Sequence, residues 1–287
     1  MPTIKEIATF LRTALQPLYD PREAAAIASL YVQCLLKMPR HELVLRGNEP
    51  VEESLMADIQ RDVEELVQGC PVQYVLGETE FYGLPFKVSP AVLIPRQETE
   101  ELVQKVAQRY AGKHVKIWDV GTGSGCIAVT LAKLLTDALV FATDISEDAL
   151  KVARRNAESN GVGVTFARHD MRDTERLPFG DTCFDVIVSN PPYIPASDRA
   201  TMHRNVTDYE PSLALFVPDD DKLWCYRALA RLAQQTLVPN GRLFAETYHD
   251  FHDELTELFH QHGFKDVRSL KDLNGRLRFV EAGGNDE

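Results

Sequence analysis

The stretch VKIWDVGTGSGCIAVTLAKLL, residues 115–135, decides the fold. Its first part, VKIWDVG, predicts a strand, and its last part, CIAVTLAKLL, predicts a helix. Between them, Gly121, Gly123 and Gly125 let the backbone turn sharply and come close to a ligand. A strand, a glycine-rich turn and a helix in this order predict the first unit of an α/β sheet.

The same alternation continues to the end of the chain. Further strands are expected at residues 139–146, 164–170, 183–190, 241–248, 264–270 and 276–282, the last two as an antiparallel hairpin around Asn274-Gly275. Further helices are expected at residues 147–161, 221–237 and 250–264. The pattern predicts a seven-stranded, mostly parallel, Rossmann-like sheet with helices on both faces. Ligands of such sheets bind at the carboxyl ends of the strands.

The N-terminal part of the chain has a different pattern. Residues 1–71 predict a small helical bundle, with helices at 4–15, 21–36 and 51–69 separated by prolines. Residues 72–100 alternate apolar and polar positions and predict a β-hairpin linker, so that residues 101–287 form the α/β domain. The bundle is either a domain with solvated acidic faces or a domain that docks a partner.

Composition limits the classes of function. With 44% hydrophobic residues and 26% charged residues, the 287-residue chain predicts a soluble globular protein. The net charge of −12 disfavours a duplex-DNA binder, although it does not exclude a local basic stripe. It contains no apolar run near the roughly 20 residues that span a bilayer, and we see no signal peptide. The five scattered cysteines form no Cys-x-x-Cys, which favours reduced thiols and a cytoplasmic location.

The glycine loop departs from the common phosphate-binding motifs. Cys126 stands where a dinucleotide fingerprint has its third glycine, and no Gly-Lys-Ser/Thr of a P-loop follows. Ser124 has Thr122 two residues before it, where the nucleophile elbow Gly-x-Ser-x-Gly requires a glycine. A purely structural turn is the alternative to a ligand-binding loop.

The charges around the loop narrow the choice of ligand. Residues 119–148 contain one basic and five acidic residues, among them Asp119 at the start of the loop and Asp144 at the end of the second strand. A carboxylate at the position of Asp144 can accept both hydroxyls of a ribose. This end therefore favours S-adenosylmethionine, a cation with a ribose and no phosphate, over NAD or ATP. Asp170 ends the third strand and either accepts from the adenine amino group or is a solvated turn residue.

The fourth strand leads into VSNPPYIP, residues 188–195. The double proline stops the sheet and makes a stiff corner. The amide oxygen of Asn190 and the carbonyl of Pro191 can accept both hydrogens of one –NH₂ group, and Tyr193 adds a flat face and a hydroxyl. Accepting both hydrogens raises electron density on a delocalised nitrogen, and alignment with a methyl carbon supplies in-line geometry. A stiff loop without chemistry is the alternative.

These motifs resemble S-adenosylmethionine-dependent methyltransferases with an Asn-Pro-Pro-Tyr motif and, more narrowly, the release-factor glutamine methyltransferases (HemK/PrmC). The resemblance covers nearly the whole chain, including the helical N-terminal domain and DVGTGSGCIAV, ATDISEDALKVARRNA, FDVIVSNPPYI and NGRLFAE. LIPRQETE and YEPSLALF distinguish it from adenine methyltransferases that share only Asn-Pro-Pro.

The resemblance implies N5-methylation of the glutamine in the Gly-Gly-Gln motif of peptide-chain release factors, which the helical domain would help to dock. The implied catalytic and substrate-binding residues are Asn190, Pro191, Pro192 and Tyr193. The implied cofactor contacts are Asp119, Gly121, Thr122, Gly123, Ser124, Gly125, Asp144, Ile145, Asp170, Met171 and Asn190. We expect a monomer without a metal, a membrane contact or stable nucleic-acid binding.

Two other functions remain open: a nucleic-acid adenine N6-methyltransferase, and a non-catalytic protein that binds release factors or ribosomes. The sequence also departs from the family pattern. Gln97 replaces the proline of IPRPETE, and Met171 stands where a tryptophan often lies beside the adenine. His249 and His252 suggest a metal site but lack a third ligand, so we expect both to be solvated helix residues.

Overall fold

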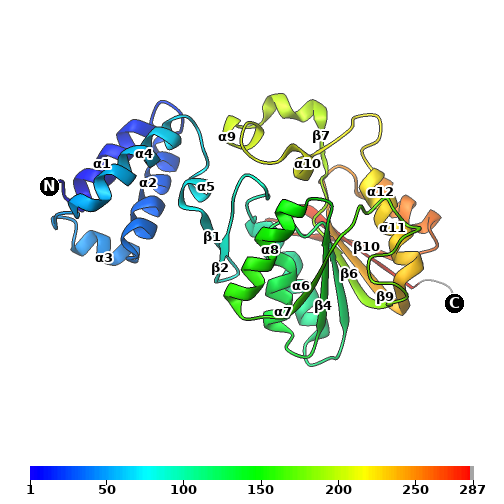
Figure 1. The fold of residues 1–287 in the computed structure, drawn as a ribbon. Coiled ribbons are helices and arrows are strands. Elements are labelled where there is room, and N and C mark those ends of the chain that lie inside the picture. Colours follow the sequence, from blue (N-terminus) through cyan, green and yellow to red (C-terminus); the bar gives the residue numbers. More distant parts are fainter. Residues whose placement is uncertain (285–287) are drawn as a thin grey trace. The chain divides into compact units, whose positions relative to one another are not determined.

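The computed structural model describes residues 1–284, which form two compact units (Figure 1). The smaller unit contains Met1–Glu78 together with His203–Tyr209, and the larger unit contains the other described residues. Within the smaller unit, the His203 ring stacks on Tyr19 with 5.2 Å between ring centroids, and the Tyr209 hydroxyl donates to the Gln68 carbonyl at 3.1 Å. The segment that follows the Asn-Pro-Pro-Tyr motif thus returns to the helical unit, which the sequence did not indicate.

The smaller unit is helical, as predicted. Its helices are α1 (Ile4–Leu15), α2 (Pro21–Leu36), α3 (Arg40–Leu45), α4 (Met56–Val67) after the 3₁₀ turn η1 (Glu53–Leu55), α5 (Val72–Leu76) and α9 (Arg204–Thr207). Thr3 and Glu6 form a capping box at the start of α1, which satisfies two N–H groups that the helix leaves unpaired. Leu11, Leu15 and Tyr31 are fully buried between the helices.

The segment between bundle and sheet is only partly a hairpin. Strands β1 (Glu78–Phe81) and β2 (Leu84–Lys87) pair around a tight turn, but residues 72–76 at the start of the predicted linker form helix α5. Helix α6 (Gln97–Tyr110) follows.

The larger unit contains the predicted seven-stranded sheet, in the order β10-β11-β9-β6-β3-β4-β5. Its strands are β3 (Lys116–Val120), β4 (Leu139–Asp144), β5 (Val164–Arg168), β6 (Phe184–Ser189), β9 (Leu237–Glu246), β10 (Asp266–Lys271) and β11 (Leu277–Gly283). The five strands from β9 to β5 are parallel, and β11 and β10 are added antiparallel. The chain runs outward from β3 through β4 and β5 and then returns to β6 on the other side of β3. The carboxyl ends of β3 and β6 therefore form the switch point at which such sheets bind ligands.

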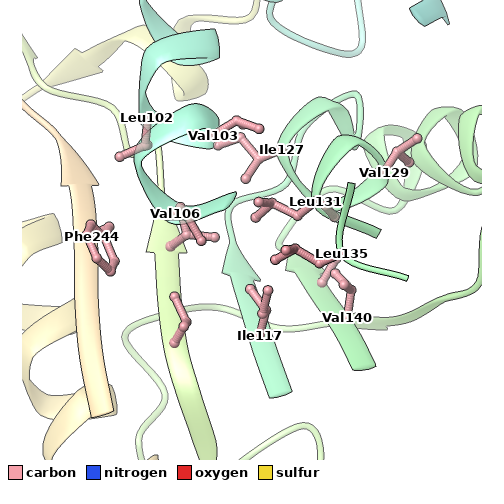
Figure 2. Packing of buried hydrophobic residues seen from close by; sticks show 14 of the residues in the cluster. Leu102, Val103, Val106, Ile117, Ile127, Val129, Leu131, Leu135, Val140 and Phe244 are labelled. Atoms are coloured by element: carbon pink, nitrogen blue, oxygen red, sulfur yellow. The ribbon is translucent and has the colours of Figure 1, made fainter. Parts of the chain in front are cut away.

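Helices cover both faces of this sheet (Figure 1). Helices α6, α7 (Cys126–Leu134) and α8 (Glu147–Asn160) contribute to one apolar cluster, and α11 (Trp224–Thr236) and α12 (His252–Gln261) contribute to the other. Neighbouring residues of β3 point to opposite faces, because Ile117 belongs to the first cluster and Trp118 to the second. Figure 2 shows Leu102 and Val106 of α6 in the cluster that also contains Ile117 and Phe244 of the sheet.

Several segments differ from the sequence-based expectation. Residues 194–217 contain the short elements β7 (Ile194–Pro195), η2 (Ala196–Thr201), α10 (Ser212–Leu215) and β8 (Phe216–Val217), and β9 begins at Leu237 rather than at residue 241. No helix among the described residues has the length and apolar composition needed to cross a bilayer. All five cysteines are free thiols.

The expectation that both histidines near α12 are solvated was wrong for one of them. His249 has a largely exposed side chain, but His252 is only 4% exposed. Its ring nitrogens lie 2.9 Å from the Thr247 hydroxyl and 3.0 Å from the Ser269 hydroxyl. Burial lowers the pKa of His252, so the ring is a neutral, hydrogen-bonded part of the core. The described residues contain no group of three side chains able to hold a metal ion.

Candidate active site

A cavity lies at the carboxyl ends of β3, β4, β5 and β6, within the larger unit. Its wall includes these predicted site residues: Gly121, Thr122, Gly123, Ser124, Asp144, Ile145, Asp170, Met171, Asn190 and Pro192. The other predicted site residues lie outside its lining: Asp119, Gly125, Pro191 and Tyr193. One cavity therefore joins most of the predicted cofactor contacts to Asn190 and Pro192. These two residues belong to the Asn-Pro-Pro-Tyr motif, residues 190–193, which is called the acceptor corner below.

The glycine loop needs its glycines for two reasons. Gly121, Gly123 and Gly125 have φ angles of +76°, +54° and +82°, a region that costs other residues energy. A Cβ atom on Gly125 would also lie 3.1 Å from the Cβ of Ala153 in α8. Gly125 thus allows close helix packing, and Gly121 and Gly123 form the wall of the cavity.

Asp119 stabilises the glycine loop through hydrogen bonds. The side chain is fully buried, and one carboxylate oxygen accepts from the Thr122 hydroxyl at 2.6 Å and from the Ala128 N–H at 3.2 Å. Burial raises the pKa of Asp119 to about 7. In this structure, Asp119 shapes the loop and does not form part of the cavity wall.

Asp144 lies between the loop and α8 and reaches the cavity. One oxygen accepts from the Gly123 N–H and the other from the Ser146 N–H, both at 2.9 Å. Burial raises the pKa of this carboxyl. Each carboxylate oxygen has a further lone pair, so the side chain can still accept hydroxyl groups of a ligand.

Asp170 has a partner that the sequence analysis did not consider. The Arg172 guanidinium donates to both of its oxygens, at 2.6 Å for the shortest contact, and lowers the pKa of the Asp170 carboxyl. The same guanidinium lies 5.6 Å from the centroid of the Trp224 ring. Arg172 and Trp224 both line the cavity.

The acceptor corner contains a chain of side-chain hydrogen bonds. The Asn190 amide NH₂ donates to the Thr99 hydroxyl oxygen at 3.0 Å, and the Thr99 hydroxyl donates to Glu246 at 2.7 Å. The Tyr193 hydroxyl donates to the other oxygen of Glu246 at 2.9 Å. The Asn190 amide oxygen accepts no hydrogen bond from the described residues, and Asn190 lines the cavity. The corner therefore contains an amide oxygen without a partner among the described residues, on a side chain that lines the cavity.

The carboxylate at the end of this chain is deeply buried. Glu246 is 1% exposed, and burial raises the pKa of its carboxyl, while the hydrogen bonds from Thr99 and Tyr193 favour the ionised form. Burial and the negative charge of Glu246 raise the pKa of Tyr193 well above its usual value. The Tyr193 hydroxyl is thus a donor to Glu246, and its ring packs against the second apolar cluster, 6.4 Å from the ring centroid of Tyr248.

Comparison with known proteins shows the family. Residues 6–77 match the PrmC N-terminal domain, and residues 111–276 match a methyltransferase domain. The chain is 39% identical to the release factor glutamine methyltransferase of Flavobacterium psychrophilum over 97% of this chain and 98% of that protein. It is 38% identical to the protein of the same name from Bacteroides thetaiotaomicron over 97% and 99%. This chain belongs to the release factor glutamine methyltransferase family.

Solved structures support the fold. A methyltransferase from Pyrococcus furiosus aligns with a TM-score of 0.53 and 16% identity, covering 82% of this chain and all of that one. The 16S rRNA N2 G1207 methyltransferase of Thermus thermophilus aligns with a TM-score of 0.52 and 16% identity over 72% of this chain and 50% of that one. At this identity, the likeness concerns the methyltransferase fold alone.

The two motifs that distinguish this family in the sequence meet at the cavity. Arg96 of LIPRQETE forms an ion pair with Glu210 of YEPSLALF, and the Ile94 N–H donates to the same carboxylate at 3.1 Å. Glu210 is buried, and Arg96 and Leu213 both line the cavity. The pair therefore joins two distant segments into one part of the cavity wall.

Sequence reasoning missed four residues around the cavity. Thr99 and Glu246 lie inside the quoted motifs LIPRQETE and NGRLFAE. The motifs marked these segments as typical of the family, but they did not indicate the hydrogen bonds that the two residues form. Arg172 and Trp224 carried no such signal. Gln97, the departure from IPRPETE, is the first residue of α6, a position at which proline is also common, so the exchange does not require a different start of the helix.

Proposed function

We propose that this protein transfers a methyl group from S-adenosylmethionine to the side-chain amide nitrogen N5 of the glutamine in the Gly-Gly-Gln motif of a peptide-chain release factor. One observation carries the proposal: Asn190, whose amide oxygen accepts no hydrogen bond from the described residues, lines the same cavity as the glycine loop. Such an oxygen can accept an N–H of a primary amide. The relatives named release factor glutamine methyltransferase support the choice of substrate.

The charged groups of the cavity fit S-adenosylmethionine. Arg96 is paired with Glu210 and Arg172 with Asp170, whereas Asp144 has no ion-pair partner among the described residues. An uncompensated carboxylate disfavours a phosphate and suits a cation that carries ribose hydroxyls. Gly121, Gly123 and Asp144 would hold this cofactor, with Met171 and Trp224 as further wall. When bound, the cofactor supplies an electrophilic methyl group on a sulfonium.

The acceptor corner would prepare the substrate nitrogen. Asn190 accepts one N–H through its side-chain oxygen, and the Pro191 carbonyl is the proposed acceptor of the other. Two acceptors fix the plane of the amide and increase electron density on a nitrogen whose lone pair is otherwise delocalised. The proton leaves after the nitrogen has gained the methyl group and has become more acidic, so no histidine base is needed.

The helical unit is the proposed docking domain for the release factor, and we propose a monomer that acts in the cytoplasm. The match of residues 6–77 to the PrmC N-terminal domain supports a family-specific role for this unit. Removing the helical unit should lower kcat/KM for methylation of the intact release factor more than kcat/KM for methylation of a short Gly-Gly-Gln peptide.

Methyl transfer with defined substrates tests the proposal. The protein is incubated with labelled S-adenosylmethionine and a purified release factor, and the tryptic peptides are analysed by mass spectrometry. We expect one added methyl group on the glutamine of the Gly-Gly-Gln peptide and none on a release factor whose glutamine is changed to alanine. A parallel reaction with DNA and RNA tests the adenine N6 alternative. Label on nucleic acid alone would overturn the proposal.

A further inference from the structure

We infer that Thr99 and Glu246 are positioning residues that fix the Asn190 side-chain amide with its oxygen toward the cavity. The inference rests on the proposed function, in which this oxygen accepts an N–H of the substrate. Neither residue lies at the motif that presents Asn190: Thr99 is 91 residues away in the sequence and belongs to α6, and Glu246 ends β9.

The direction of each hydrogen bond follows from Glu246. Both oxygens of Glu246 accept, one from the Thr99 hydroxyl at 2.7 Å and the other from the Tyr193 hydroxyl at 2.9 Å, so Thr99 uses its single hydrogen on this carboxyl group. The Thr99 oxygen is then available only as an acceptor. The group of Asn190 that contacts it at 3.0 Å must therefore be the NH₂, which leaves the amide oxygen on the other side.

The opposite orientation of the amide would block the reaction. The two ends of an asparagine amide have nearly the same size, so shape alone discriminates poorly between them. A flipped Asn190 would direct its NH₂ toward the cavity, where it would meet the N–H groups of the substrate amide. Two donors facing each other cannot form a hydrogen bond, and the substrate nitrogen would lose one of its two acceptors.

The surroundings make this arrangement stable. Thr99 and Glu246 are 2% and 1% exposed, so water cannot easily replace a lost partner. Tyr193 donates to the second oxygen of Glu246 at 2.9 Å, so both oxygens of this carboxyl group are held by hydroxyl donors. Asn190 and Tyr193, both of the Asn-Pro-Pro-Tyr motif, are thus joined through Glu246 to α6.

Substitution of Thr99 by a residue of the same shape tests the inference. Thr99→Val removes the hydroxyl and should lower kcat for release-factor methylation on the order of 10- to 100-fold, the range expected when one acceptor for the reacting group is misplaced. The S-adenosylmethionine affinity should change less than about twofold, because no contact on the glycine-loop side is altered. Thr99→Ser keeps the hydroxyl and should restore most of the rate.

Thr130→Val is the matched control. Thr130 is fully buried in α7, its hydroxyl has no hydrogen-bond partner among the described residues, and it does not line the cavity. We expect wild-type kcat for this variant. Equal losses in Thr99→Val and Thr130→Val would show a general packing effect and overturn the inference.

A double-mutant cycle with Asn190→Ala separates positioning from stability. If Thr99 acts through Asn190, Thr99→Val should cost little further rate in single-turnover reactions once the amide is gone. The same further loss in both backgrounds would overturn the inference. Should Thr99→Val fail to fold, Glu246→Gln, which places an NH₂ in the chain of bonds, takes its place in the same cycle. A wild-type enzyme that does not methylate release factor would instead reject the proposed function, so the two failures are distinguishable.

Discussion

The two sides of the cavity are held by different kinds of hydrogen bond. On the glycine-loop side, Asp144 accepts from the backbone N–H groups of Gly123 and Ser146. On the acceptor side, Asn190, Thr99 and Glu246 are linked through side-chain atoms only. The first side depends mainly on the path of the backbone, and the second depends on the identity of three side chains. We therefore expect substitutions on the first side to affect binding, and substitutions on the second to affect the rate.

The largest expected effect is that of Asn190→Ala. It removes the acceptor that gains most from the charge developing on the substrate nitrogen, and we expect a loss in kcat on the order of 100-fold or more. Single-turnover methylation measures the loss, and titration of S-adenosylmethionine measures binding, which should be largely preserved. Unchanged turnover would contradict the expectation that the acceptor side controls the rate of methyl transfer.

Asp144→Ala is the corresponding change on the loop side. Lost hydrogen bonds to a charged group are worth about 1.5–3 kcal/mol, so cofactor affinity should fall about tenfold or more. Calorimetry with S-adenosylmethionine measures it, and Asp148→Ala is the control, because Asp148 carries the same charge on an exposed side chain paired with Lys151. Equal affinity in wild type and Asp144→Ala would reject the assignment.

The pH dependence of protein stability tests the role of Asp119 on the glycine-loop side. Its pKa is about 7 in the folded protein, above the ordinary 3.8, so the folded state holds a proton that the unfolded state releases at lower pH. Stability from this group is complete below the lower pKa and is lost as the pH rises toward 7. Between pH 5 and 7 we expect the free energy of unfolding of the wild type to fall by about 1–2 kcal/mol relative to that of Asp119→Asn. This total is smaller than the fall of about 1.36 kcal/mol for each pH unit that a fully shifted group would give, because the buried site relaxes around the charge.

Urea unfolding of both proteins across this range measures the difference. The Asp119→Asn variant should become relatively more stable as the pH rises, and cofactor affinity at a fixed pH should change little, because Asp119 does not line the cavity. Parallel stability curves would mean that Asp119 keeps an ordinary pKa beneath the loop.

The same difference explains how much the sequence could predict. The strands, most helices and the glycine loop depend on local patterns, such as the left-handed Gly161 that ends α8 and the alternation of Ile117 and Trp118 between the two faces. Helix α3 was missed because six residues carry little periodicity. The short elements at residues 194–217 were missed for the same reason.

The loop side was predictable because its parts lie within residues 119–146. On the acceptor side the sequence pointed to Asn190 but not to its partners, because Thr99, Asn190 and Glu246 meet only through the pairing of β6 with β9 and the packing of α6 on the sheet. Asp119 and Gly125 were predicted as cofactor contacts from their place in the loop. The structure places neither residue in the lining of the cavity, so their contact with the cofactor stays a prediction.

Trp224 is the residue whose role the sequence left most hidden, and its substitution has the smallest expected effect. The chain has two tryptophans: Trp118 is fully buried and hydrogen-bonded to Thr143, and Trp224 lines the cavity. Cofactor binding should therefore change the fluorescence of Trp224 and leave Trp118 silent. Trp224→Phe keeps an aromatic wall, so we expect the affinity to fall less than about threefold while the fluorescence change disappears. A fluorescence change that persists in this variant would mean that the cofactor does not reach the part of the cavity formed by α11, and that the loop side alone defines its site.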